Sequence, residues 1–335
     1  MLHLIGRRLL FLVAVLLGIS LLTFIFAHVM PTDPARLLAG PHATPAQYQA
    51  IRHHYGLDQP VLKQYLLYLE GLAHGDLGSS GLSQRAVTDD LIAYLPATIE
   101  LSFTALLIAI LVGLALGIVA AFRRNSWVDS LVSVLALSGL AMPAFWLGLL
   151  AQLLFYYILN WFPSGGRLTL GMLPPPHHTG LFTIDSILAG RLDLLGNALW
   201  HLTLPSVVLA SGSIGVIARM VRGSLIEAMG QDYVRTARAK GLSRFQVVMR
   251  HALRNSLLPT ITVVGLQCGY LLSGAILVET VFTWPGIGLY ATQSILAADY
   301  PPIVGVTLTI ALIYVLVNTV VDLTYSATDP RVRYS

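Results

Sequence analysis

The sequence has 335 residues, of which 56% are hydrophobic and only 11% are charged, whereas a soluble globular domain carries about 25% charged residues. This composition excludes a soluble enzyme or binding domain and indicates an integral membrane protein. The net charge of +4 does not predict a nucleic-acid partner, because the basic residues are distributed as they are in the loops of a membrane protein. The single cysteine, Cys268, excludes an internal disulfide.

Six apolar stretches are long enough to cross a bilayer as helices, which needs about 20 residues. They cover residues 9–29, 98–122, 130–159, 202–220, 259–282 and 303–325. The first follows basic residues in the manner of a signal peptide, but it is a full span long and no small-residue cleavage site follows it. We therefore expect an all-α integral membrane protein with six transmembrane helices, the first of them uncleaved within residues 1–30.

Residues 31–96, between the first two spans, are expected to form a small helical segment on the outer membrane surface. The sequence TPAQ at Thr44–Gln47 is a capping box with proline at the first helical position, which predicts the start of a helix. Gly56 predicts its end. Apolar residues at helical spacing between Val61 and Leu72 predict a second helix.

Lysine and arginine residues divide unevenly between the two sides that six spans define. Fourteen lie at the two termini, after the second span and between the fourth and fifth spans, and six lie in the remaining loops. The positive-inside rule places the fourteen in the cytoplasm. The chain is thus predicted to be a multi-pass protein of the cytoplasmic membrane, with both termini cytoplasmic.

Residues 97–335 hold the other five spans and two contrasting loops. Residues 160–197 are rich in proline and glycine and are expected to form an ordered but irregular outer loop. Residues 221–258 are basic, and a second capping box at Ser243–Gln246 begins an amphipathic helix there. Gly241 suits the left-handed end of a preceding helix. This basic loop is either a surface helix on anionic lipid or a protruding knuckle that another protein grips.

The segment DYVRTARAKGLSRFQVVMRHALRNSLLP, within the basic loop, closely resembles the cytoplasmic loop of permease subunits in the dipeptide, oligopeptide and nickel family of ABC importers, and in particular its dipeptide branch. The likeness covers the whole chain and includes, in order, HVMPTDPARLLAG, YGLDQPVLKQY, HGDLGSS, LPATIELSF, AMPAFWLG, ETVFTWPGIG, DYPPIVG and DPRVR. The general importer motif begins Glu-Ala-Ala, whereas this chain has Arg235, Thr236 and Ala237 and keeps Gly241. In this departure from the general motif, the chain resembles the peptide branch of the family.

The resemblance implies that residues 221–258 contain the coupling helix, which docks in a cleft on a cytoplasmic ATPase. The positions that match it are Tyr233, Arg235, Thr236, Ala237, Arg238, Ala239, Lys240 and Gly241. The resemblance also implies a bacterial inner membrane and four kinds of partner besides the lipid bilayer. These are a second homologous permease subunit, two cytoplasmic ABC ATPase subunits, an extracytoplasmic solute-binding protein and a peptide substrate.

Sequence signatures of catalysis are missing from the chain. It has no GxxxxGK[ST] phosphate loop, no GxSxG and no HExxH. We expect a transport subunit that is not an enzyme and holds no cofactor, with ATP and Mg²⁺ bound by the partner ATPases. The pairs His53–His54 and His177–His178 do not predict a metal site, because adjacent residues on a helix point about 100° apart.

A few positions within the spans are candidates for the translocation path. Pro143 is expected to kink the third span, either for packing or as part of a gate. Phe145 and Glu279 are the other candidates. Gly113 and Gly117 have the spacing for close helix approach. The spans lack partners for both termini of a peptide, so high-affinity recognition is expected in the separate binding protein.

The predicted function is that of the permease subunit of an ATP-dependent importer of di- and oligopeptides. Nickel chelates, haem or modified peptides are the alternative substrates. A stand-alone secondary transporter or channel is disfavoured, because the spans lack a proton relay and a docking knuckle would have no purpose there. A membrane scaffold without transport activity is the third hypothesis.

Overall fold

The computed structural model describes residues 2–29, 44–54, 56 and 58–328. Some predictions concern residues outside these ranges, including the predicted cytoplasmic residues Arg331 and Arg333. Within them the chain is helical and has no strand, only an isolated β-bridge between Ser79 and Ala86. The predicted all-α class is therefore confirmed.

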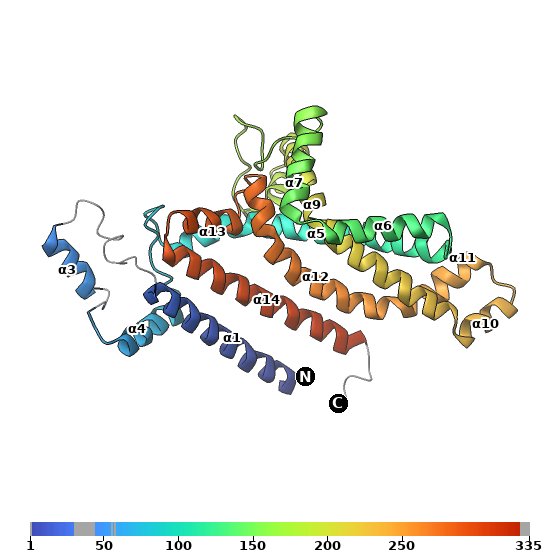
Figure 1. Cartoon of the computed structure of the whole chain (residues 1–335), viewed down its shortest axis with the longest axis horizontal. Coiled ribbons are helices and arrows are strands. Elements are labelled where there is room, and N and C mark those ends of the chain that lie inside the picture. The colour runs from blue at the N-terminus through green and yellow to red at the C-terminus, as the bar shows by residue number, and fades with distance from the viewer. Residues whose placement is uncertain (1, 30–43, 55, 57, 329–335) are drawn as a thin grey trace. The chain divides into compact units, whose positions relative to one another are not determined.

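The helices have the following bounds: α1 (Leu2–Val29), α3 (Pro45–His54), α4 (Val61–Ala73), α5 (Val87–Phe122), α6 (Trp127–Ala141), α7 (Ala144–Ala151), α8 (Phe182–Leu188), α9 (Leu192–Met229), α10 (Asp232–Ala239), α11 (Arg244–Gln246), α12 (Leu253–Val281), α13 (Ile287–Leu296) and α14 (Tyr300–Thr328). Two π-helices, η1 (Gln152–Ile158) and η2 (Val247–Ala252), continue α7 and precede α12. Figure 1 labels most of these elements.

The chain divides into two compact units. One contains Met1–Pro96 and Gly286–Val315, and the other contains Ala97–Pro285 and Leu316–Ser335. The domain boundaries expected from the sequence, at residues 30 and 96, stay a prediction.

The first unit is built around a core that α5, α13 and α14 supply. Its buried residues include Val87, Tyr290 and Val306. The predicted start of α3 is confirmed, because the Thr44 amide donates to Gln47 Oε1 (2.9 Å) and the Gln47 amide donates to Thr44 Oγ1 (3.3 Å). Gly56 has a φ of +63° just beyond the end of this helix. Such a conformation favours glycine.

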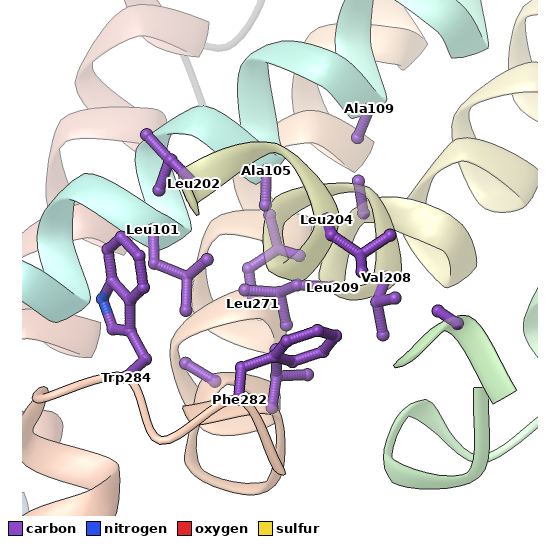
Figure 2. Close-up of a cluster of buried hydrophobic side chains, with 14 of the residues drawn as sticks. Leu101, Ala105, Ala109, Leu202, Leu204, Val208, Leu209, Leu271, Phe282 and Trp284 are labelled. Carbon is purple, nitrogen blue, oxygen red and sulfur yellow. The ribbon is translucent and has the colours of Figure 1, made fainter. Parts of the chain in front are cut away.

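The second unit has a larger core in which α5, α9 and α12 meet (Figure 2). Leu101, Leu202, Leu271, Phe282 and Trp284 are buried there. Small residues bring α5 against α9. A Cβ atom added at Gly113 would lie 2.8 Å from the Ile217 side chain, and one at Gly117 would lie 2.6 Å from the Ala218 carbonyl oxygen. The predicted close approach at these glycines is therefore confirmed.

In the described part of the chain, four helical stretches are long and apolar enough to cross a membrane: Val87–Phe122, Leu192–Met229, Pro259–Val281 and Tyr300–Val321. A shorter apolar stretch, Leu10–Ile25, lies in α1. The helix α9 begins at Leu192, ten residues before the predicted fourth span at residue 202, and its first turns include the polar residues Asp193 and Asn197. The bounds of the span itself stay a prediction.

The predicted kink at Pro143 is a complete break. The stretch Trp127–Ala141 and the stretch Ala144–Ile158 are bent by 105° relative to each other. The cause is local, because a residue that precedes proline is driven out of the helical region. Met142 accordingly has an extended ψ of 127°, and Pro143 begins α7 as its N-terminal cap.

Candidate functional site

The basic loop forms a compact projection beyond the end of α9, which we call the knuckle and define as residues 230–252. Figure 1 shows α10 and α11 together at this end of the molecule's second unit. Gly241 follows α10 with a φ of +81°, a conformation that disfavours residues with a Cβ atom. The knuckle is thus a helix, a glycine corner and a second helix, as the sequence predicted.

A complete capping box begins the second helix of the knuckle. The Gln246 amide donates to Ser243 Oγ (3.3 Å), and the Ser243 amide donates to Gln246 Oε1 (3.1 Å). Two amides at the start of the helix, which have no partner within it, are thereby satisfied. This arrangement holds the helix in place directly after the glycine corner.

The knuckle has a small apolar core of its own. The members of this cluster come from α9, α10 and η2: Leu225, Ala228, Val234, Ala237, Val247, Val248 and Ala252. Val234 and Val247 are fully buried. Phe122, at the end of α5, packs against the same cluster. Apolar burial therefore fixes the knuckle to the helices without using the charges of Arg235, Arg238 and Lys240.

The predicted coupling residues divide between this core and the surface. Ala237 is only 5% exposed and belongs to the core. The others are exposed: Tyr233, Arg235, Thr236, Arg238, Ala239, Lys240 and Gly241. Arg235 forms only an exposed ion pair with Asp232 (3.3 Å). The result is a firmly mounted basic surface with one aromatic side chain, a combination suited to docking on an acidic protein cleft.

Arg244 connects the knuckle to α5. Its guanidinium donates to the Phe122 carbonyl oxygen (2.6 Å) and lies 5.8 Å from the centroid of the Phe122 ring. The rings of Phe122 and Phe245 are stacked with centroids 6.4 Å apart. A cation at the carboxyl end of a helix also interacts favourably with the helix dipole. Arg244 is therefore a structural contact at the base of the knuckle.

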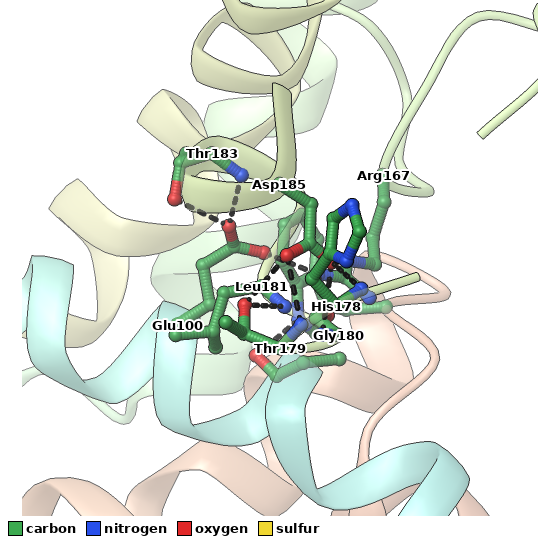
Figure 3. Close-up of polar contacts among 10 residues, drawn as sticks. Glu100, Arg167, His178, Thr179, Gly180, Leu181, Thr183 and Asp185 are labelled. Carbon is green, nitrogen blue, oxygen red and sulfur yellow. Dashed lines mark hydrogen bonds and ion pairs between the residues drawn. The ribbon is translucent and has the colours of Figure 1, made fainter. Parts of the chain in front are cut away.

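At the opposite end of α9, residues 160–190 form a second ordered segment, which we call the Arg167 loop (Figure 3). Arg167 is 8% exposed and donates to Glu100 Oε2 (2.5 Å) and to the Gly180 carbonyl oxygen (2.9 Å). Its guanidinium also lies 3.5 Å from the centroid of the Phe182 ring. Burial lowers the pKa of Arg167, and the neighbouring Glu100 opposes this effect.

Asp185 closes the same loop from α8. Its carboxylate accepts hydrogen bonds from the Thr179 amide (2.8 Å), the Gly180 amide (2.9 Å) and the Thr179 hydroxyl (2.8 Å). Burial acts to raise the pKa of Asp185, but these hydrogen bonds outweigh it, and the pKa lies below its ordinary value. A charged Asp185 is thus built into the loop.

His201 anchors the first part of this loop and was missed by the sequence interpretation. Its Nδ1 lies 2.9 Å from the Gly165 carbonyl oxygen, and its Nε2 lies 3.3 Å from Thr169 Oγ1. Of the adjacent histidine pairs noted in the sequence, His53 contacts a nearby carboxylate, because its Nδ1 lies 2.8 Å from Asp58 Oδ2. Across the described residues, no group of three or more histidine, cysteine, aspartate or glutamate residues is arranged to hold a metal ion.

The three candidates for the translocation path lie in different surroundings. Pro143 and Phe145 are exposed at the corner between α6 and α7. Glu279 is fully buried, and its Oε1 accepts a hydrogen bond from the Thr98 hydroxyl (2.6 Å). Glu279 thus differs from the other two in its exposure, and a role of these residues in the path stays a prediction.

A helical membrane chain with an exposed basic knuckle has the form of a membrane-embedded transport component. The comparison with family models supports this class. Residues 113–334 match the family described as "Binding-protein-dependent transport system inner membrane component", and residues 1–102 match its N-terminal counterpart. The chain belongs to this family, so it is a multi-pass inner-membrane component of a transport system that works with a binding protein.

Full-length relatives narrow the class further. The chain is 48% identical to the probable D,D-dipeptide transport system permease protein DdpB of Escherichia coli K12, over 96% of this chain and 94% of the relative. It is 44% identical to the dipeptide transport system permease protein DppB of Alkalihalophilus pseudofirmus, over 98% of each chain. It is 39% identical to the glutathione transport system permease protein GsiC of E. coli O6:H1, over 100% of each. The predicted permease subunit of an ABC importer, a transport component and not an enzyme, is confirmed.

Proposed function

We propose that this chain is the permease subunit of an ATP-dependent importer of di- and oligopeptides. The names of the three relatives above refer to D,D-dipeptides, dipeptides and glutathione, all of which are small peptides. Peptides delivered by an extracytoplasmic binding protein are thus the favoured substrates. Nickel chelates, haem and other modified peptides are the alternatives.

The observation that carries the coupling role is the construction of the knuckle. Its fold rests on buried apolar residues such as Val234 and Val247, so the basic residues Arg235, Arg238 and Lys240 are left for an external partner. We assign that partner as a cytoplasmic ATPase, which would bind ATP and Mg²⁺ in a separate chain. Closure of two ATPases would draw two knuckles together, one from this chain and one from a second homologous permease, and open the path outward.

The proposed topology has six spans and both termini in the cytoplasm. It adds α1, and the bent pair α6 and α7–η1 taken as one span, to the four long apolar helices. The 38 residues of α9 extend about 57 Å at 1.5 Å per residue, well beyond a hydrocarbon layer of about 30 Å. The knuckle and the Arg167 loop would therefore emerge on opposite sides, the basic knuckle in the cytoplasm.

The path itself would lie between this chain and the second permease, lined here by Pro143 and Phe145 at the corner of α6 and α7. Glu279 would join it only in a conformation that separates it from Thr98. This assignment rests on the exposure of the corner and on the 105° break there.

Purification of the tagged chain from native membranes in mild detergent tests the proposal. Mass spectrometry is expected to find two ATPases, one further permease and a binding protein that retains a peptide. A nickel chelate or haem on the binding protein would contradict the proposal that peptides are the substrates. A chain that purifies alone and takes up solute under an ion gradient would contradict the importer and support the secondary transporter.

A further inference from the structure

An ion pair between α6 and α9 lies close to the knuckle and has no part in its apolar core. Arg222 Nε lies 2.5 Å from Asp129 Oδ1, and one of its terminal nitrogens lies 2.8 Å from Asp129 Oδ2. The Asp129 side chain is 6% exposed and that of Arg222 is 31% exposed. Two parallel hydrogen bonds fix both the distance and the orientation of the partners, which a single contact would not do.

The acceptor in this pair is itself held rigidly. The Asn125 amide donates to Asp129 Oδ2 (3.0 Å), and Asn125 has a φ of +62° in the turn that precedes α6. The Asp129 amide contacts Ser126 Oγ (3.4 Å), which caps the start of the same helix. The carboxylate is therefore fixed to the first turn of α6, and Arg222 binds α9 to that turn.

Toward the C-terminal end of α6, this helix and α9 remain in contact through small residues. A Cβ atom at Gly139 would lie 2.8 Å from the Ser211 carbonyl oxygen, and Gly215 lies directly against the Ala136 backbone. The two helices are thus joined at the ion pair and again near the C-terminal end of α6. That end leads through Met142 to the break at Pro143.

At its other end α9 leads into the knuckle. Leu225, one turn beyond Arg222, is 1% exposed and belongs to the knuckle core. The knuckle is therefore packed on α9 by buried apolar contacts, and the Arg222–Asp129 pair joins α9 to the first turn of α6. We propose that α6 and α9 move as one rigid lever and that Asp129 and Arg222 are positioning residues that transmit movement of the knuckle to the corner at Pro143.

This inference rests on the proposed coupling role of the knuckle. It adds a specific consequence, because a lever that is loosened at its base should let the ATPases work without moving the corner. Uptake should then fall while assembly and ATP hydrolysis persist. A pair that merely stabilises the fold would instead reduce the amount of assembled importer and leave the ratio of uptake to hydrolysis unchanged.

The test uses the assembled importer in proteoliposomes with its binding protein and radiolabelled Ala-Ala as the probe. Arg222→Lys keeps the buried charge paired but loses the planar two-bond geometry, so it is expected to fold. Asp129→Asn removes the charge. We expect both to lower uptake per ATP hydrolysed by about tenfold, within the range of ordinary coupling energies. The matched control is Asp193→Asn, which breaks the exposed Arg191–Asp193 pair at the other end of α9 and should leave the ratio unchanged.

Gly241→Val distinguishes the two levels of the proposal. If Gly241→Val uncouples uptake while Arg222→Lys transports normally, the lever is overturned and the coupling role stands. If Gly241→Val also transports normally, the proposed function fails as well. Should Asp129→Asn not assemble, Arg222→Lys decides alone: a wild-type ratio overturns the lever, and a lowered ratio in an importer of normal composition supports it.

Discussion

The two ends of α9 are built on opposite principles. The knuckle is held by buried apolar residues such as Val234 and leaves its charges exposed. The Arg167 loop is held by buried charges, with Arg167 bound to Glu100, and leaves apolar side chains exposed. Leu170 is 100% exposed and Leu173 is 83% exposed.

This inversion separates the residues that fold each segment from those left for a partner. Apolar contacts bind the knuckle without directional requirements, so the charges of its predicted coupling residues, such as Arg235 and Lys240, can change with little effect on its fold. Buried charges bind the Arg167 loop only while each has its partner. Substitutions of charged residues should consequently have large structural effects at one end of α9 and mainly functional effects at the other.

The largest loss of stability is expected for Arg167→Met. It leaves Glu100 buried without a cation, and breaking one side of a buried pair costs about 3–5 kcal/mol. Thermal unfolding of the purified chain and limited proteolysis within residues 168–178 measure the effect. Arg191→Met, which breaks the exposed pair with Asp193 at the start of α9, is the control and should change little. Equal effects of the two substitutions would contradict the comparison.

Asp185→Asn should loosen the loop less, by about 1–3 kcal/mol, because amide donors lose a charged acceptor but remain able to meet water or the new amide oxygen. Acid should act on the same carboxylate. The folded pKa of Asp185 is lowered from 3.8, so its contribution is complete above that pH and is lost as the pH falls below it. Proteolysis of the loop at decreasing pH measures this. Asp185→Asn should remove the pH dependence, and an unchanged profile would exclude Asp185 as its cause.

At the knuckle, Ser243→Ala should cost about 1 kcal/mol, the usual value of an N-terminal cap, whereas Ser243→Gly should cost only a few tenths. Hydrogen exchange of the amides from Arg244 to Val247 reports the local change. If alanine and glycine are equivalent, the capping box does not stabilise the start of α11.

The smallest change of stability is expected for Arg235→Gln, because Arg235 is exposed and its pair with Asp232 is open to water. Uptake should nevertheless fall by about fivefold or more if this charge binds the ATPase. Uptake and thermal unfolding are measured together, with Lys63→Gln, an exposed cation of α4, as the control. Normal uptake by Arg235→Gln would remove this residue from the docking surface.

The sequence predicted what depends on neighbours along the chain. Ser243 and Gln246 are three residues apart, and the left-handed conformation of Gly241 depends only on its own backbone. The two helices of the knuckle and the corner between them could therefore be predicted from a short segment of sequence. A kink at Pro143 was predicted for the same reason. The complete break and its 105° angle were not predicted, because the direction of the chain after Pro143 depends on packing against α9 and α12.

Interactions between distant residues were missed. Arg167 and Glu100 are 67 positions apart, and Arg222 and Asp129 are 93 apart. In the sequence Arg167 is a loop cation and Glu100 a charge near the start of a span, with no pattern that connects them. The short helix α13 was also missed, because it lies between the predicted fifth and sixth spans, where no helix was predicted.

The central claim, that the knuckle docks on an ATPase, is tested most directly by a photoreactive residue at position 233. Tyr233 is 39% exposed and belongs to the surface left free by the knuckle core. In the assembled importer, irradiation should cross-link this position to an ATP-hydrolysing subunit, whereas the same residue at position 170 should not. Cross-links from position 233 to lipid alone, or an ATPase cross-linked equally from both positions, would contradict the account.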